Sequence, residues 1–168
     1  LKAPRIGSDY ATIAEKARQA SWTYEEYLAA VLSVEASARA ESGAAGRIKR
    51  AGFRQIKTID EFDFSTQPAL DRARIARLET GGWITEAANV IFLGPPGTGK
   101  THLATGLGVI AARQGYRVAF DTAAGWITRL TQAHSIGGLT TLLAKLNRYH
   151  LLIIDEVGYV PIEAEAAN

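Results

Sequence analysis

The residues best suited to chemistry lie in one glycine-rich stretch, "GPPGTGKT" at 94–101. It fits the phosphate-binding pattern G-x-x-x-x-G-K-[ST] and lies between an apolar stretch and a helical one. Its glycines let the backbone approach phosphate oxygens without an intervening Cβ, and the amides of residues 97–101 can converge at the N-terminus of the following helix. We predict that Lys100 reaches the β- and γ-phosphates of a nucleoside triphosphate and that the Thr101 hydroxyl ligates Mg²⁺.

This stretch, hereafter the P-loop, defines the predicted nucleotide site. The alternative is a glycine-rich turn with an incidental lysine, and the strand-then-helix context argues against it. The residues predicted to bind the nucleotide are Gly94, Pro95, Pro96, Gly97, Thr98, Gly99, Lys100, Thr101 and His102.

Two adjacent carboxylates could complete the chemistry. The apolar run "LLIID" at 151–155 ends in Asp155, and Glu156 follows it. We predict that Asp155 holds the metal, together with Thr101, and that Glu156 orients and deprotonates an attacking water. A kinase acting on a small molecule does not need the second carboxylate, so the pair favours hydrolysis, with Lys100 and Glu156 as catalytic residues. Two acidic residues that merely cap a strand are the alternative.

Other reactive residue types contribute little. The chain has no cysteine, which excludes disulfides, zinc-finger spacing and a thiol nucleophile. His102 is expected to pack on the helix after the P-loop rather than to catalyse a step. His134 and His150 have no partner at metal-ligand spacing.

The P-loop and the carboxylates require a scaffold of alternating strands and helices. Short apolar runs predict strands at 90–94, 117–122 and 151–155, as expected of strands buried on both faces. Helices are expected at 101–113 and, broken near 135–138, at 124–148. This alternation predicts an α/β fold with a parallel sheet and helices on both faces, spanning residues 89–168.

A helical module is predicted upstream, over residues 1–52. Apolar residues at three- and four-residue spacing run through 8–50, and Thr23 with Glu26 forms a capping-box signature. The glycines at 43 and 46 are expected to interrupt this helix.

A linker over residues 53–88 is predicted to join the module to the core. Pro68 suits the first turn of a helix over 69–79, and "TGGW" at 80–83 should end it. The linker carries three aromatic anchors, Phe53, Phe62 and Phe64.

The composition is that of an ordinary soluble protein, with 47% hydrophobic and 21% charged residues. No apolar run is long enough for a membrane span and no signal-peptide pattern is seen, so we expect a cytoplasmic protein. The net charge is +2, but Arg47 to Lys57 holds five basic residues and no acidic one. This basic run could contact DNA phosphates or could simply be a solvated helix end.

Three stretches together resemble the IstB-like transposition-helper ATPases, a branch of the AAA+ proteins close to the DnaC-type helicase loaders. They are "FLGPPGTGKTHLATGLG", "YHLLIIDEVGYVP" and "KTIDEFDFSTQPALDR". The resemblance runs through nearly the whole chain. The Walker A and Walker B motifs alone would indicate only a P-loop ATPase, whereas the flanking "DEFDFS", "THLA" and "DEVGYVP" narrow it to this family.

The resemblance implies a P-loop NTPase of AAA+ type, a three-layer sandwich preceded by the helical module. It implies an ATPase that assembles into homo-oligomers on double-stranded DNA and acts with an insertion-sequence transposase. By position, residues 94–101 would bind ATP and Mg²⁺, Asp155 would hold the metal and Glu156 would be the catalytic base. The helical module and the basic run would contact DNA or neighbouring subunits.

The family pattern also predicts elements that this sequence does not contain. In AAA+ sheets a strand following Asp155 inserts beside the P-loop strand, and a sensor residue and a trans-acting arginine lie further on. We therefore expect a fragment or truncated form, which also lacks an initiating methionine, with little nucleotide binding or hydrolysis alone. The alternatives are a DnaC-type helicase loader, a non-catalytic nucleotide-binding adaptor and, least favoured, a small-molecule kinase.

Overall fold

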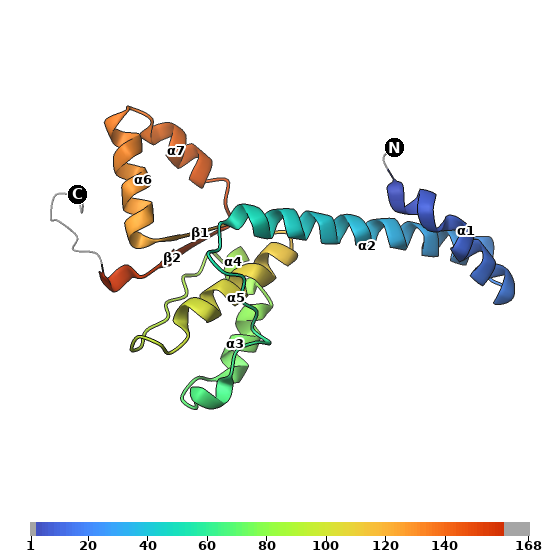
Figure 1. Cartoon of the computed structure of the whole chain (residues 1–168), viewed down its shortest axis with the longest axis horizontal. Coiled ribbons are helices and arrows are strands. Elements are labelled where there is room, and N and C mark those ends of the chain that lie inside the picture. Colours follow the sequence, from blue (N-terminus) through green and yellow to red (C-terminus); the bar gives the residue numbers. More distant parts are fainter. Residues whose placement is uncertain (1–2, 160–168) are drawn as a thin grey trace. The chain divides into compact units, whose positions relative to one another are not determined.

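The computed structural model of the chain describes residues 3–159 (Figure 1). Internal contacts divide the chain into two units, one up to Ala45 and one from Gly46. The division predicted from the sequence, at 1–52, 53–88 and 89–168, stays a prediction, and positions 160–168 of its last segment lie outside the described residues. No helix among the described residues is both long enough and apolar enough to cross a membrane.

Two helices begin the chain, α1 (Pro4–Gln19) and α2 (Tyr24–Ala51). The predicted capping box is confirmed, because Thr23 N–H donates to the Glu26 carboxylate at 2.7 Å and Glu26 N–H donates to the Thr23 hydroxyl at 3.2 Å. The interruption expected at the two glycines is wrong, since α2 runs through both. An interior glycine costs only about 1 kcal/mol relative to alanine, and a 28-residue helix can absorb that.

The linker contains a short 3₁₀ turn, η1 (Phe64–Thr66), and helix α3 (Arg72–Glu79). This helix begins three residues later than predicted, because Asp71 rather than Pro68 determines its start. The Asp71 carboxylate accepts the backbone N–H groups of Ala73 and Arg74 at 2.9 and 3.2 Å, as an N-cap does. Helix α3 ends before Gly81, as expected, and an unpredicted one-turn helix, α4 (Gly82–Thr85), follows.

The sheet consists of two parallel strands, β1 (Val118–Thr122) and β2 (Leu151–Asp155). Their register places Thr122 beside Asp155, and both strands lie where the sequence predicts them. The expected helices are also present as α5, α6 and α7. The last two form a pair broken near residues 135–138, and a 3₁₀ turn, η2, follows β2. Their bounds are Lys100–Arg113 for α5, Ala123–Ser135 for α6, Leu139–Leu146 for α7 and Val157–Tyr159 for η2.

The strand predicted at 90–94 is wrong. This segment has no ladder partner in the described part of the chain, and Ile91 and Leu93 are 77% and 90% exposed. An apolar run becomes a strand only when a neighbouring strand takes up its backbone hydrogen bonds. No strand among residues 3–159 lies beside the 90–94 segment. The resulting fold is α/β with an incomplete sheet, consistent with an incomplete P-loop NTPase.

Helix α5 forms the centre of the core and is buried along most of its length. On one side it packs with β1 and β2, where a Cβ at Gly108 would lie only 2.7 Å from the Ile153 side chain. On another side Leu103 and Leu107 pack with Phe62 and Ile75 of the linker and α3. In Figure 1 the α6–α7 pair lies across the two strands from α5. The core therefore holds the first turn of α5 against both the sheet and the linker.

Candidate functional site

The P-loop lies between the 90–94 segment and α5, as the motif requires. Gly97 and Gly99 have φ angles of 80° and 82°, in the left-handed region that favours glycine. Gly99 occupies the N-cap of α5, so the last amides of the loop lie at the positive end of that helix. The backbone thus has the conformation that a phosphate cradle needs.

The Lys100 ammonium is held by the P-loop's own carbonyl groups. Its Nζ donates to Gly94 O at 2.9 Å and to Pro95 O at 2.7 Å, while the Thr98 hydroxyl donates to the same Pro95 oxygen at 2.9 Å. The cation therefore folds back over the loop. A phosphate entering the loop would offer a charged acceptor in place of two neutral ones.

Thr101 and Asp155 meet although 54 positions separate them in the sequence. The Thr101 hydroxyl lies 3.0 Å from each oxygen of the Asp155 carboxylate. Thr101 is in the first turn of α5 and Asp155 is the last residue of β2, and the packing of α5 on the sheet brings these two ends together. The structure thus places both predicted metal ligands at one point.

This pair of groups has the donor chemistry of a Mg²⁺ site. Mg²⁺ prefers hard oxygen ligands and is usually bound by one or two carboxylates together with substrate phosphates and water. A hydroxyl and one carboxylate beside a phosphate loop fit that pattern. Among the described residues no group of three or more His, Cys, Asp and Glu side chains could hold a metal ion.

Glu156 directly follows the metal-ligand candidate and is exposed. Its φ angle is 57°, an uncommon value for a residue with a side chain. Glu156 follows the last residue of β2, and its role as catalytic base stays a prediction. The left-handed backbone could not be foreseen from the residue type.

His102 contacts the linker rather than the P-loop. Its Nε2 lies 2.7 Å from Thr58 O, and its ring packs edge-on against Phe62 with centroids 5.3 Å apart. The expectation that His102 packs agrees with this geometry, whereas its place among the nucleotide contacts stays a prediction. Sequence reasoning missed the contact with Thr58, since 44 residues separate the two and no periodic pattern connects them.

The remaining histidines have different surroundings. His150 accepts the Arg117 backbone N–H at its Nδ1, at 3.0 Å, and packs edge-on against Tyr116. His134 lies exposed near the end of α6. Neither belongs to a metal-binding group within residues 3–159.

The basic run divides into one structural arginine and several exposed cations. Arg47 is half-buried, and its Nε donates to Ala112 O at 2.6 Å, near the C-terminus of α5. A cation at this end of a helix complements the partial negative charge of the terminal carbonyls. Lys49, Arg50 and Arg54 are exposed. Arg47 therefore contributes to the fold, and only the exposed cations are available for another partner.

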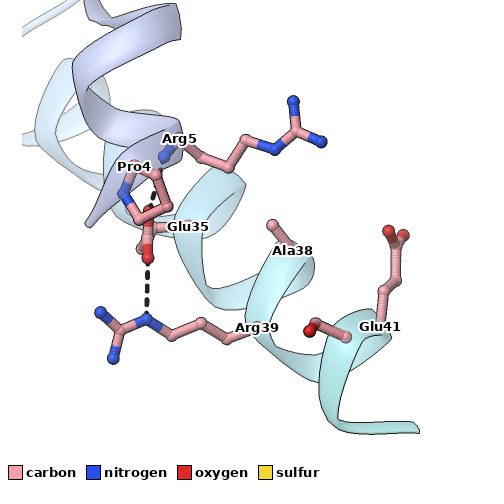
Figure 2. Close-up of a pocket in the computed structure, with 7 residues that line it drawn as sticks. Pro4, Arg5, Glu35, Ala38, Arg39 and Glu41 are labelled. Carbon is pink, nitrogen blue, oxygen red and sulfur yellow. Dashed lines mark hydrogen bonds and ion pairs between the residues drawn. The ribbon is translucent and has the colours of Figure 1, made fainter. Parts of the chain in front are cut away.

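A hollow of about 470 Å³ lies within the first unit, between α1 and α2 (Figure 2). Its main polar group is Glu35, which accepts the backbone N–H groups of Arg5 and Ile6 and the Nε of Arg39. The Arg39 hydrogen bond, followed by the two backbone hydrogen bonds, lowers the pKa of Glu35 against the opposing effect of burial. Every buried side-chain nitrogen and oxygen in the described chain has a hydrogen-bond partner. Glu35 therefore caps the N-terminus of α1 at this hollow.

Comparison with known proteins completes this picture. The model of the family described as IstB-like ATP binding protein matches residues 1–168. The chain is 36% identical over its whole length to a protein of insertion sequence IS21 from Pseudomonas aeruginosa, and it covers 63% of that protein. It is also 36% identical over its whole length to a protein of insertion sequence IS5376 from Geobacillus stearothermophilus, covering 67% of it. The names of both relatives describe ATP binding.

A protein of insertion sequence IS232 from Bacillus thuringiensis subsp. berliner is 34% identical over 146 residues, which are 87% of this chain and 58% of that protein. The chain thus spans between 58% and 67% of the length of these three relatives. The chain has a phosphate-loop motif with an adjoining hydroxyl–carboxylate pair, and the family model matches all 168 residues. The chain therefore belongs to the IstB-like ATP-binding family.

Proposed function

We propose that the P-loop and Asp155 form the ATP- and Mg²⁺-binding site of a transposition-helper ATPase. The observation that carries the proposal is the contact of the Thr101 hydroxyl with both oxygens of the Asp155 carboxylate, at 3.0 Å each. A glycine-rich turn with an incidental lysine would have no reason to meet a carboxylate 54 residues away. The names of the relatives, which describe ATP binding, support the choice of nucleotide.

The proposed roles follow from the chemistry of each group. Lys100 leaves its two carbonyl partners and pairs with the β- and γ-phosphates, while the amides at the start of α5 hydrogen-bond phosphate oxygens. Thr101 and Asp155 hold Mg²⁺, which when bound neutralises charge on the phosphates. Glu156 accepts a proton from a water whose oxygen bonds to the γ-phosphorus as the bond to the β–γ bridging oxygen breaks, giving ADP and phosphate.

The biological setting is a second part of the proposal. The relatives belong to insertion sequences, and the whole protein is proposed to assemble with copies of itself on double-stranded DNA and to act with a transposase. The exposed cations of the basic run, Lys49, Arg50 and Arg54, suit the DNA backbone, because each phosphate they neutralise releases a counterion.

The nucleotide proposal is tested by titrating the chain with a fluorescent ATP analogue in the presence of Mg²⁺. Lys100→Ala removes the charge predicted to pair with the phosphates, and the Kd should rise by about 10- to 100-fold, as for the loss of a hydrogen bond to a charged group. Lys145→Ala is the matched control, because Lys145 is an exposed lysine in the last turn of α7. Equal affinity of the Lys100→Ala and unaltered chains would refute the proposed site.

A further inference from the structure

The linker segment 57–64 packs directly behind the P-loop. Phe62 is 9% exposed, and its ring lies against Gly99 so closely that a Cβ at that glycine would overlap the ring atom Cε2. The same ring packs edge-on against His102, at an interplanar angle of 87°. One aromatic side chain thus contacts both the last glycine of the P-loop and the first turn of α5.

A hydrogen bond fixes the same turn from a second point. The Thr58 carbonyl can only accept, so His102 Nε2 carries a hydrogen and donates it across 2.7 Å. Thr58 is itself held, because its backbone N–H donates to the Glu61 carboxylate at 2.9 Å. That hydrogen bond is the main reason that the pKa of Glu61 is lowered. The acceptor of the His102 hydrogen bond therefore belongs to an ordered turn.

The aromatic side chain is supported from behind. Phe64 packs edge-on against Phe62 with centroids 4.9 Å apart, and the Arg72 guanidinium lies 4.8 Å from the centre of the Phe64 ring. Phe62 also belongs to the buried cluster that contains Leu103 and Leu107 of α5. The ring is consequently fixed between the core and the loop.

We propose that Phe62 and His102 are positioning residues that hold Gly99 and the first turn of α5 in the phosphate-binding arrangement before nucleotide arrives. A preformed loop does not have to be ordered on binding, so its affinity for phosphate is higher. This inference rests on the proposed function for its expected effect on nucleotide affinity. Its structural part, a P-loop held by the linker, can be measured without nucleotide.

The first experiment measures hydrogen exchange at the Leu103 amide, which donates to Gly99 O at 3.0 Å. Phe62→Leu should speed this exchange about tenfold through local opening at the start of α5. The Gln114 amide, which donates to Ile110 O at the other end of the helix, should change little. Phe53→Leu is the matched control, because it removes a ring of equal size that packs against α5 at Gly108 rather than at Gly99.

Two results of this experiment would overturn the inference. If the Leu103 and Gln114 amides accelerate together, the Phe62 ring only stabilises the fold. If Phe53→Leu accelerates Leu103 exchange as much as Phe62→Leu does, the contact with Gly99 has no special role.

The second experiment measures affinity for the fluorescent ATP analogue. His102→Leu removes the donor to Thr58 and should raise the Kd by about tenfold, whereas His102→Gln, whose amide can donate from a similar position, should stay within about twofold. Equal loss in both variants would contradict the role of the hydrogen bond. If the unaltered chain binds no analogue while Leu103 exchange still responds to Phe62→Leu, the proposed function fails and the positioning role stands.

Discussion

At the scale of single residues, the candidate site combines a hydroxyl–carboxylate pair with one unusual backbone conformation. A left-handed conformation costs an L-residue with a side chain about 1–2 kcal/mol. Glu156 has this conformation directly after β2, at the position proposed for the catalytic base. Strained backbone is concentrated at functional sites, where the orientation of a side chain matters more than stability. We infer that the left-handed turn directs the Glu156 carboxylate away from the strand direction.

This interpretation predicts a difference between two variants that both lack the carboxylate. Glu156→Gly should be more stable than Glu156→Ala by about 1 kcal/mol, because glycine adopts a positive φ freely and alanine does not. The free energy of unfolding in urea, followed by tryptophan fluorescence, measures the difference. Trp126 is a suitable reporter, since its indole N–H donates to Ile153 O of β2 at 3.1 Å. Equal stability of the two variants would show that the backbone at 156 is not strained.

At the scale of helices and strands, the sequence pattern correctly predicted the elements that local interactions determine. The runs at 117–122 and 151–155 form strands, and the similar run at 90–94 does not, because only the first two have each other as partners. Likewise the helix predicted from residue 69 begins later, because the Asp71 carboxylate accepts two backbone N–H groups of its first turn. The P-loop residues and Asp155 could be chosen from motif and spacing. The support given by Phe62 and Thr58 could not, since it depends on how the linker folds over α5.

Helix termini also belong to this scale, and the N-terminus of α1 is capped by a side chain of another helix. Its N-terminus has no side-chain cap of its own. Instead the Glu35 carboxylate of α2 accepts the free N–H groups of Arg5 and Ile6, and it also pairs with Arg39 (Figure 2). An anion at this end of a helix is further favoured by the helix dipole. The charge on Glu35 therefore links the two helices of the first unit.

The lowered pKa of Glu35 makes this link dependent on pH. The folded state binds the proton less readily than the unfolded state, so the stabilisation is complete above the ordinary glutamate pKa of about 4.3 and is lost as the pH falls towards the lower folded value. Glu35→Gln should melt at a lower temperature at neutral pH and lose less stability on acidification. Thermal melts followed by far-UV circular dichroism over this pH range measure both effects.

The control for this experiment is Glu41→Gln, an exposed glutamate that lines the same hollow. It should retain the acid dependence of the unaltered chain, because Glu35 and the other carboxylates with lowered pKa values, Glu61 and Asp63, are all present in it. The same acid dependence in Glu35→Gln and Glu41→Gln would contradict the role of Glu35.

At the scale of the whole molecule, the charged residues that sum to a net charge of +2 are unevenly distributed along the chain. Residues 87–154 contain six lysines and arginines and a single carboxylate, Asp121, a net charge of +5. That carboxylate is paired with Arg129 at 3.0 Å. The basic run at 47–57 adds further exposed cations. A chain of this kind suits a polyanionic partner, and the structure narrows which cations can be tested.

The resulting prediction concerns binding to duplex DNA of arbitrary sequence. Arg47 is left unchanged, because its contact with Ala112 O would make any loss of binding ambiguous. The double variant Lys49→Ala with Arg50→Ala should weaken binding similarly for all sequences and reduce the slope of log K against log salt by about two, or roughly 0.9 per lost phosphate contact. Fluorescence anisotropy at several salt concentrations measures the slope. Arg74→Ala with Arg77→Ala, an exposed cationic pair of α3, should leave the slope unchanged. Equal effects of the two double variants would show that the basic run is ordinary solvated surface.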